Sequence, residues 1–510
     1  MSQALGRLAL LLAVVLGSAC TALPPRPPLA PQTALPAATQ GALAARFEPL
    51  ARAHPGVSGF VPLESGADAF AARLWLADRA AASLDVQCYI WRDDRSGRWL
   101  LARLAAAAER GVRVRLLLDD NHGSPALDEA LAQLDAHPAA EVRLFNPFRS
   151  RGFGRRVELI ADLPRLNRRM HNKSFTADGR ATILGGRNVG DEYFGIADPM
   201  QFADLDVLGI GPIAPQVAKA FDAYWNSESA WPLAVLREPG RPAPPNAGRL
   251  AEDERYARAI VGRPQVERWR ADGPRDDDIA WARATLLVDP PDKALGEAGA
   301  HELVMPKLER ALGRAERSID LVSPYFVPSA DAIDAYRALH ERGVRLRVLT
   351  NSLAATDVAA VHAGYADRRV ALLEAGVELY ELKPTPGSSR SGRLLRAGSS
   401  REASLHAKTF AVDGERIYIG SLNFDPRSAW LNTEIGVLLE HAGLARRIGL
   451  AFDQEVPRDA WRVSLQDGRL RWSEATPEGP AEAPQAEPGA SWPLRWWTWM
   501  LSWLPIDGLL

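Results

Sequence analysis

The chain has 510 residues, with 61 Lys or Arg against 63 Asp or Glu, which gives a formal net charge of −2 at pH 7. Near-neutrality excludes a globally basic nucleic-acid-binding protein, and two cysteines exclude a disulfide framework and a cysteine-rich metal site. The length is sufficient for two or three domains with substantial cores. Only six of the 61 cationic residues are lysine, so each lysine raises the question of what arginine could not do there.

The N-terminus has the pattern of a secretory signal. Arg7 precedes an apolar run from Leu8 to Leu16, which is too short to cross a bilayer but typical of a signal peptide. The small residues before Cys20 resemble a bacterial lipobox, which implies that residues 1–20 are a lipoprotein signal and that Cys20 is lipidated. An ordinary cleaved signal or a short uncleaved anchor is the alternative. The Pro- and Ala-rich residues 21–45 are predicted to form an extended tether.

The body of the chain contains an internal duplication. SLDVQCYIW from Ser83 matches SIDLVSPYF from Ser318, and a second pair of similar segments follows in each half at nearly the same offset. Each copy contains a β-rich run, a helical stretch and a second apolar β-run, which is the pattern of a β-α-β unit. Cys88 lies in the first β-rich run and is predicted to be a buried core residue. The sequence therefore predicts an α/β protein of two halves related by a pseudo-two-fold axis. The predicted halves are residues 46–235 and 281–474, and the Pro-, Gly- and charge-rich residues 236–280 are the predicted linker.

Each half contains one copy of the motif H-x-K-x4-D. Only nine His and six Lys occur in the chain, so two copies 235 residues apart, in register with the duplication, are not accidental. In a strand, side chains two residues apart point to the same side, so each His and Lys is expected to be presented together. The motif residues are His171, Lys173 and Asp178 in the first half and His406, Lys408 and Asp413 in the second.

Turn residues and small residues follow each motif. Asp178 and Asp413 are each followed by Gly and another β-run, a hairpin pattern that favours a scaffold role for the aspartate over direct chemistry. Small residues allow a ligand to approach the backbone, and the amide of Asn can donate to phosphate oxygens. The matched residues are Gly185, Gly186 and Asn188 in the first half and Gly420, Ser421 and Asn423 in the second.

Arginines are concentrated before both motifs, where they could attract anionic lipid headgroups; a solvated surface loop is the alternative. The first cluster is Arg149, Arg151, Arg155, Arg156, Arg165, Arg168 and Arg169, and the second is Arg390, Arg393, Arg396 and Arg401.

The C-terminus is rich in tryptophan. Residues 475–490 are predicted to be a disordered spacer, and residues 491–510 contain five of the 15 Trp. On a helix, Trp496, Trp499, Met500 and Trp503 would share one face. Trp prefers the bilayer interface, so this segment is predicted to be an in-plane membrane helix, with packing on the protein's own surface as the alternative.

Two His, two Lys and two Asn that converge across a pseudo-two-fold axis would make a site for an anionic tetrahedral group. One imidazole can attack phosphorus and form a covalent phospho-enzyme, while the other protonates the leaving alkoxide. A compact ammonium can stabilise the equatorial oxygens in a pocket too tight for a guanidinium. This chemistry requires no metal and no cofactor. Asp204 and Glu434 follow the histidine of their own half by 33 and 28 residues and are candidates for orienting the imidazoles.

These motifs resemble those of the phospholipase D superfamily, and the wider similarity, over about residues 60–510, is to bacterial cardiolipin synthases, most closely the C type. The segments that carry it include DVQCYIWRDD, GGRNVGDEYF, NSLAATDVAAVHAGYA, GSLNFDPRS and the C-terminal LPIDGLL. The resemblance implies two phospholipase D-like domains, each a mostly β sheet sandwiched by helices, with the active site at their interface. It implies that His171 is the nucleophile and His406 the acid/base, an order that the sequence alone leaves open. The first copy departs from the family's common Gly-Ser, since it has Gly186 where the second copy has Ser421.

The implied function is that of a phosphatidyltransferase in the bacterial cell envelope, attached to a membrane and facing the periplasm. A phosphatidyl group from phosphatidylglycerol or phosphatidylethanolamine would pass to His171 and then to a hydroxyl of a second phosphatidylglycerol. The same site supplied with water would make a phospholipase D hydrolase that releases phosphatidic acid, and no residue decides between the two acceptors. A nuclease is disfavoured by the near-neutral charge and the two membrane-directed ends. A non-enzymatic lipid-binding lipoprotein is disfavoured by the two intact His/Lys pairs.

Overall fold

The computed structural model describes residues 23–151, 154–195, 200–237, 267–269, 271, 273–384, 402–476, 479–483 and 486–503. The predicted signal peptide with Cys20, most of the predicted linker and the last seven residues lie outside this range.

The first half is built on a mixed sheet with a parallel centre. Strands β2, β3 and β4 are parallel, and the other strands pair antiparallel to give the order β9-β4-β3-β2-β5-β6-β8-β1. The strands are β1 (Ser58–Leu63), β2 (Ser83–Cys88), β3 (Arg113–Asp119), β4 (Ala140–Phe145), β5 (Ser174–Ala177), β6 (Ala181–Gly185), β8 (Asp206–Ile210) and β9 (Ala230–Pro232).

The second half repeats this order, so the structure confirms the duplication. Its sheet has the order β20-β19-β18-β13-β12-β11-β15-β16-β17-β10, with β11, β12 and β13 as the parallel centre. Strand β1 pairs antiparallel with β10 and joins the two sheets into one. The strands are β10 (Ala280–Val288), β11 (Ser318–Val322), β12 (Arg345–Asn351), β13 (Glu378–Leu382), β15 (Thr409–Val412), β16 (Arg416–Gly420), β17 (Ile435–Glu440), β18 (Ala460–Gln466), β19 (Arg469–Thr476) and β20 (Gly479–Glu482).

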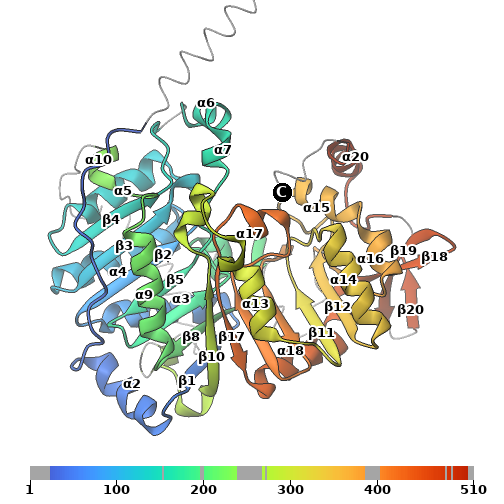
Figure 1. Ribbon diagram of the computed structural model, residues 1–510, viewed down its shortest axis with the longest axis horizontal. Helices are drawn as coiled ribbons and strands as arrows, with labels where there is room; N and C mark the ends of the chain where they lie inside the picture. The colour runs from blue at the N-terminus through green and yellow to red at the C-terminus, as the bar shows by residue number, and fades with distance from the viewer. Residues whose placement is uncertain are drawn as a thin grey trace, which may run out of the picture.

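Helices cover both sheets and connect the parallel strands (Figure 1). Several begin where a side chain accepts a backbone N–H of the first turn, as Ser65, Asp94, Ser124 and Ser329 do. The longer helices are α2 (Ala42–Ala53), α3 (Gly66–Arg79), α4 (Arg95–Glu109), α5 (Pro125–Asp135), α6 (Gly154–Ala161), α9 (Ile213–Trp225), α13 (Val304–Leu312), α14 (Ala330–Glu341), α15 (Ala359–Ala366), α18 (Ala442–Gln454) and α20 (Trp492–Leu501). The shorter helices are α7 (Leu163–Leu166), α8 (Asp191–Phe194), α10 (Leu233–Leu236), α16 (Arg369–Glu374), α17 (Pro426–Trp430) and α19 (Val456–Asp459).

Equivalent strands supply equivalent core residues. Val86 and Leu116 are buried in the core of the first half, as Leu321 and Val348 are in that of the second. Cys88 is also buried, as its place in an apolar strand predicts. Burial of these apolar side chains, about 1.5–3 kcal/mol each, holds the parallel strands in place and fixes the edge at which the site residues emerge.

The predicted tether over residues 21–45 is not a free segment where the structure describes it. The backbone N–H of Gln32 donates to Asn226, and that of Ala34 donates to Asp222 of α9. Helix α2 then begins at Ala42. Polar groups of α9 therefore hold the Pro-rich segment along the first half, where it appears as the dark blue trace of Figure 1.

The predicted disordered spacer over residues 475–490 is likewise partly ordered. Strand β19 runs to Thr476 and pairs with β20, and Glu487 accepts hydrogen bonds from the buried Arg369. Helix α20 follows and packs against α15, so the predicted C-terminal helix forms. Within the described ranges, no helix is both long and apolar enough to cross a membrane.

Candidate active site

Both His-x-Lys pairs lie in extended loops that lead directly into strands, β5 in the first half and β15 in the second. The sequence predicts them inside a strand, but the strands begin one residue after each lysine. All four side chains are nearly buried, with 5% of each histidine and 2% of each lysine exposed. Each ammonium donates to the carbonyl of the histidine two residues earlier, Lys173 to His171 at 2.5 Å and Lys408 to His406.

A parallel contact between the halves places a glutamate beside the first histidine. Met170 forms an isolated parallel bridge with Thr433, and the N–H of His171 donates to the carbonyl of Thr433 at 2.9 Å. This contact also brings the residues that follow Met170 and Thr433 together. Nδ1 of His171 consequently lies 2.9 Å from the Glu434 carboxylate.

A parallel strand contact between the halves also places a carboxylate beside the second histidine. The two-stranded sheet of β7 (Met200–Ala203) and β14 (Glu402–Leu405) is parallel and pairs Ala203 with Leu405. The residues that follow are Asp204 and His406, and Nδ1 of His406 lies 2.6 Å from the Asp204 carboxylate.

The structure therefore pairs each carboxylate with the histidine of the opposite half, a pairing that spacing along the chain left open. The cause is the two parallel contacts between the halves, which align Met170 with Thr433 and Ala203 with Leu405. Each catalytic candidate consequently depends on both halves.

Gly186 and Ser421, which follow the two motifs, both lie against the carboxylates that contact the histidines. Ser421 donates through its hydroxyl to Glu434, and Ser428 donates to the same carboxylate at 2.8 Å. In the first half, a Cβ at Gly186 would overlap the Asp204 carboxylate. The Asp204 carboxylate thus fills the space that a side chain at position 186 would need. In the second half, the Glu434 carboxylate leaves room for the Ser421 side chain and accepts its hydroxyl. This difference explains why the first half has Gly186 where the second half has Ser421.

The two matched asparagines differ in their contacts. Asn188 accepts from the N–H of Ile90 at 3.1 Å and donates to the hydroxyl of Tyr193 at 3.0 Å, so its amide holds protein groups. Asn423 is buried, and its Oδ1 has no hydrogen-bond partner among the described residues. Of the two, Asn423 is therefore the one whose amide oxygen is unpaired among the described residues.

Both motif aspartates accept backbone N–H groups, as a scaffold role requires. Asp178 accepts the backbone N–H groups of Ala81, Ala82 and Ser83 at the start of β2, at 2.7–3.1 Å. Asp413 accepts the equivalent three groups before β11. Both have positive φ, 55° and 57°, as do the glycines that follow, which is the conformation of a tight hairpin.

Replacing Asp413 with Ala is therefore expected to lower the free energy of unfolding by about 3 kcal/mol, because three backbone donors lose their acceptor. The measurement is the urea midpoint, and the matched control is Asp413→Asn, which retains one acceptor oxygen and is expected to lose less. The folded Asp413→Ala variant should keep its activity at low temperature. A stable but inactive variant would instead assign Asp413 a chemical role.

Aromatic rings pack against both imidazoles, and these contacts were not predicted from the sequence. The Tyr89 ring lies 4.9 Å from that of His171 at 71°, and the rings of Tyr193 and Phe202 lie 5.2 and 5.1 Å from that of His406. Tyr89 directly follows β2, and Tyr193 lies in α8, which begins three residues after Asn188. Their positions after strand ends were visible in the sequence, but the ring that each would contact was not.

The charges of the two halves act on one another, as expected of a single site. Burial together with Lys173 and Lys408 lowers the pKa of His171 well below its ordinary value. Burial and the same two lysines lower the pKa of His406 to about 4, against the opposing effect of Asp204. Both imidazoles are therefore neutral at pH 7 before an anionic ligand enters.

The two carboxylates differ in their proton affinity. Burial raises the pKa of Glu434 to about 7, despite the opposing charge of Lys173. Burial also acts on Asp204, but His406 and Lys408 outweigh it and hold its pKa below the ordinary value. The carboxylate beside His406 is thus the more firmly ionised of the two.

The lowered pKa values of Lys173 and Lys408 lead us to expect that activity falls at alkaline pH. Burial lowers the pKa of Lys173 to about 7 and that of Lys408 to about 8. The ammonium form exists below these values, so we expect kcat/KM to fall as the pH rises through 7 to 8, by about tenfold per unit once one lysine is deprotonated. The measurement is a pH profile with a short-chain phospholipid, whose phosphodiester does not titrate in this range. A profile that stays flat to pH 10 would contradict the charge role of the lysines.

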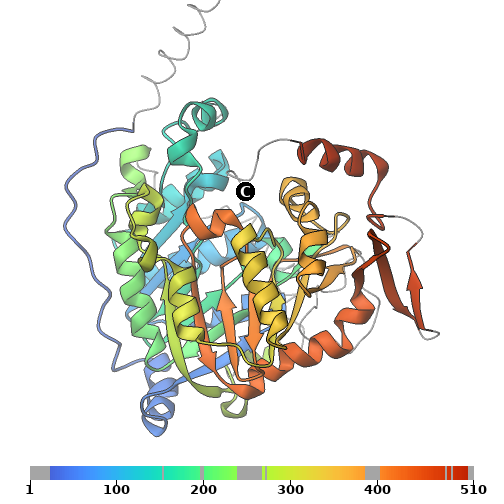
Figure 2. The same ribbon diagram turned by 45° about the vertical axis from the view of Figure 1, so that its right-hand side comes forward.

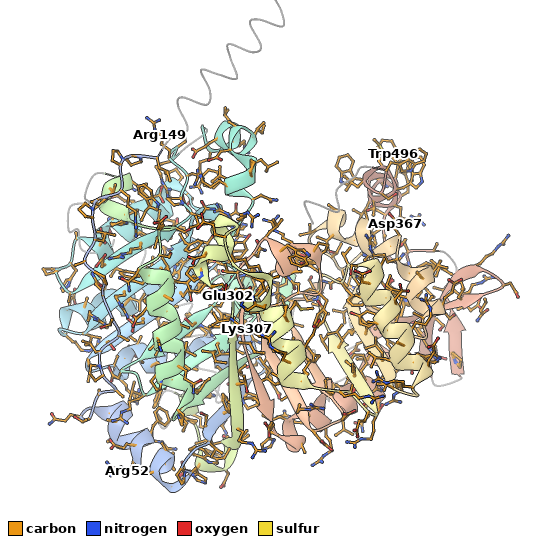
Figure 3. The ribbon with its side chains drawn as sticks, viewed as in Figure 1. Arg52, Arg149, Glu302, Lys307, Asp367 and Trp496 are labelled. Atoms are coloured by element: carbon orange, nitrogen blue, oxygen red, sulfur yellow. The ribbon has the colours of Figure 1, made fainter. Side chains whose placement is uncertain are left out.

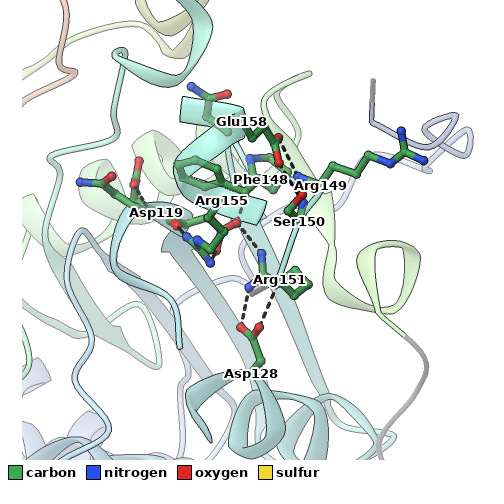
Figure 4. Close-up of polar contacts among 12 residues, drawn as sticks. Asp119, Asp128, Phe148, Arg149, Ser150, Arg151, Arg155 and Glu158 are labelled. Atoms are coloured by element: carbon green, nitrogen blue, oxygen red, sulfur yellow. Dashed lines mark hydrogen bonds and ion pairs between the residues drawn. The ribbon is translucent and has the colours of Figure 1, made fainter. Parts of the chain in front are cut away.

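Most of the first arginine cluster is committed to structural ion pairs. Arg151 is paired with Asp128 (Figure 4). Arg151 and Arg155 are both paired with Asp120. Arg169 lies 3.0 Å from Asp119, which also accepts the N–H of Met170 and so fixes the segment that enters the site. These three arginines are therefore paired with carboxylates of the first half, and the headgroup role of the cluster stays a prediction. The second cluster lies outside the described residues.

Comparisons with known proteins agree with the geometry of two halves around one site. The family model described as "Cardiolipin synthase, PLD-like domain" matches residues 76–225 and 308–456, once in each half. The chain therefore belongs to the phospholipase D superfamily, in the family of cardiolipin synthase-type domains. This confirms the family and the fold that the motifs predict.

Individual relatives agree with this assignment. The chain is 46% identical over 476 residues to cardiolipin synthase C of Escherichia coli, over 92% of this chain and 99% of that protein. It is 28% identical over 382 residues to cardiolipin synthase B of the same species, over 74% and 75% of the two chains. Among solved structures, phosphatidylserine synthase of Haemophilus influenzae matches with a TM-score of 0.57 over 91% of this chain and 99% of that chain. Its identity is 13%, so that likeness concerns the fold.

Proposed function

We propose that this protein is a cardiolipin synthase-like phosphatidyltransferase. It moves a phosphatidyl group from phosphatidylglycerol or phosphatidylethanolamine to a hydroxyl of a second phosphatidylglycerol. The observation that carries the proposal is the pair of buried histidines, each held at Nδ1 by a carboxylate of the opposite half and flanked by a lysine.

In the first step, His171 is the nucleophile. Because Nδ1 of His171 lies beside Glu434, its Nε2 is the nitrogen left to attack phosphorus. A bond forms between Nε2 and phosphorus, and the bond from phosphorus to the headgroup oxygen breaks. The leaving alkoxide takes a proton from His406, and the two ammoniums stabilise the charge on the phosphoryl oxygens.

In the second step, His406 accepts the proton of the incoming hydroxyl, the hydroxyl oxygen bonds to phosphorus, and His171 leaves. The assignment of His406 as acid/base is supported by Asp204, the more firmly ionised carboxylate. An anionic phosphodiester offsets the two lysine charges that lower the pKa of His406, so substrate binding favours its protonated form.

The alternative is a phospholipase D hydrolase, in which water replaces the lipid hydroxyl. Transfer is favoured because both imidazoles are nearly buried beneath aromatic rings and because two relatives are named as cardiolipin synthases. The proposed location is a membrane of the cell envelope on its periplasmic side. The lipobox-like residues before Cys20 and the exposed tryptophans of α20 support it.

The test is the reaction of purified full-length protein with labelled phosphatidylglycerol, with and without phosphatidylethanolamine, followed by separation of the lipid products. Labelled cardiolipin is the expected product, and the amount formed with and without phosphatidylethanolamine identifies the donor. Phosphatidic acid as the sole product would establish the hydrolase instead.

A further inference from the structure

A short helical projection, which we call the spur, carries apolar side chains into solvent. It consists of α6 and α7, and α7 ends five residues before His171. Ile160 is 82% exposed and Val157 is 56% exposed, and these two residues lie three apart on α6. Leu159 and Leu163 are exposed as well. A cluster of exposed aliphatic side chains on a folded domain marks an interaction surface.

A surface helix usually buries its apolar side chains, but α6 exposes aliphatic side chains and buries a glutamate. Glu158, between exposed Val157 and Leu159, is buried and accepts the backbone N–H groups of Arg149 and Ser150 at 2.9 Å (Figure 4). The ion pairs of Arg151 and Arg155 with buried Asp120 hold the base of the spur to the first half. Glu158 and Arg155 thus face inward and the aliphatic side chains face outward, in a position that these contacts fix.

Helix α20 presents a second apolar surface from the other half. A buried Thr498 lies on the side opposite its tryptophan face, and Glu487 before the helix is bound by His362 and Arg369 at α15 and α16. The tryptophans of that face recur at intervals of three or four residues, and each is more than half exposed. They are Trp492, Trp496, Trp499 and Trp503.

The spur and α20 project from the same end of the molecule. Figures 1 and 2 show α6 and α20 at the upper end, with α17 between and below them, and Figure 3 places Arg149 and Trp496 at this end. Helix α17 carries Ser428, which donates to Glu434 in the active site. Arg427 of the same helix donates to Asn167 at the end of α7. The two surfaces therefore flank the element that connects the site to this end.

We propose that the spur and α20 form a two-point docking surface for a phospholipid bilayer. The aliphatic spur of the first half and the tryptophans of the second half enter the interfacial region together and hold the active-site end against the lipid. Trp prefers that region, aliphatic side chains are stabilised below it, and exposed Arg156 on the spur offers a cation to anionic headgroups. The inference takes its lipid substrate from the proposed function, but the docking geometry can be measured without activity.

Site-specific labelling tests the geometry. Cys88 is buried, and Cys20→Ser removes the only other cysteine, so a single new cysteine can carry a polarity-sensitive fluorophore. The positions are Ile160→Cys, Trp496→Cys and, as a control, Leu450→Cys, which is 52% exposed on α18. Figure 1 shows α18 at the lower end of the molecule, away from α6 and α20. With vesicles of phosphatidylglycerol and phosphatidylethanolamine, we expect a blue shift and quenching by brominated lipid at 160 and 496 but not at 450.

Quenching at 496 alone would overturn two-point docking, as would equal quenching at all three positions. A blue shift at 160 that depends on protein concentration in the absence of lipid would assign the spur to self-association and also overturn the proposal.

Activity separates this inference from the proposed function. The double substitution Val157→Ser with Ile160→Ser is expected to lower turnover on vesicles by about tenfold, because apolar surface no longer enters the bilayer. Turnover of a monomeric short-chain phospholipid should be unchanged, and Leu450→Ser should change neither. Equal loss on both substrates would overturn docking by the spur. Absence of transferase activity from the unaltered protein on either substrate would overturn the proposed function and leave the fluorescence result valid.

Discussion

Replacing His171 with Asn is expected to abolish transfer, with a loss of roughly 10⁴-fold or more, because the variant lacks the proposed nucleophile that bonds to phosphorus. His406→Asn should also abolish turnover of natural lipids, but for a different reason. With a donor whose leaving group needs no proton, such as a nitrophenyl phosphodiester, His406→Asn should still form the phospho-enzyme and then fail to release it.

The measurement is radiolabel retained on the denatured protein after reaction with a labelled activated donor. We expect label on His406→Asn, none on His171→Asn, and full activity in the control His301→Asn, whose side chain is exposed. Label on His171→Asn and none on His406→Asn would reverse the two roles.

A second large effect is expected from replacing the two carboxylates that contact the histidines of the opposite halves. Glu434→Gln and Asp204→Asn are each expected to lower kcat by about 10²–10⁴-fold, because an amide holds the wrong tautomer of the adjacent imidazole. Glu434 contacts the nucleophile of the other half, so Glu434→Gln should slow phospho-enzyme formation with every donor. Asp204 contacts His406, so Asp204→Asn should form the phospho-enzyme at a near-normal rate from the activated donor.

Rapid-mixing measurements of the first step with natural and activated donors distinguish the two variants. Glu440→Gln is the matched control, since Glu440 lies on β17, which begins directly after Glu434, and makes an exposed ion pair with Arg283. If Asp204→Asn slowed the first step equally with both donors and Glu434→Gln did not, each carboxylate would act on the histidine of its own half.

Local sequence information was sufficient for the features that depend on neighbouring residues. The duplicated β-α-β units, the burial of Cys88 and the hairpins at Asp178 and Asp413 all follow from periodicity and turn chemistry within a few residues. The exposed aromatic face of α20 follows from spacing in the same way. These predictions hold because strand alternation, helix periodicity and turn conformation are set by local geometry.

Contacts between residues distant in the chain were not predictable in this way. The glycine at position 186 is explained only by the Asp204 carboxylate, and Arg151 and Arg155 turn inward only because Asp120 is buried beneath them. Spacing in the sequence carries no signal for such contacts, because they depend on how separate elements pack.

The motif spacing and the internal duplication were enough to assign the two His/Lys pairs to equivalent positions in two copies of one fold. Which carboxylate contacts which histidine became visible only in the folded chain. Glu434 is 263 residues from His171, and Asp204 is 202 residues from His406. Both pairs form because parallel strand contacts between the halves bring consecutive residues of each segment into register, and that register exists only in the folded chain.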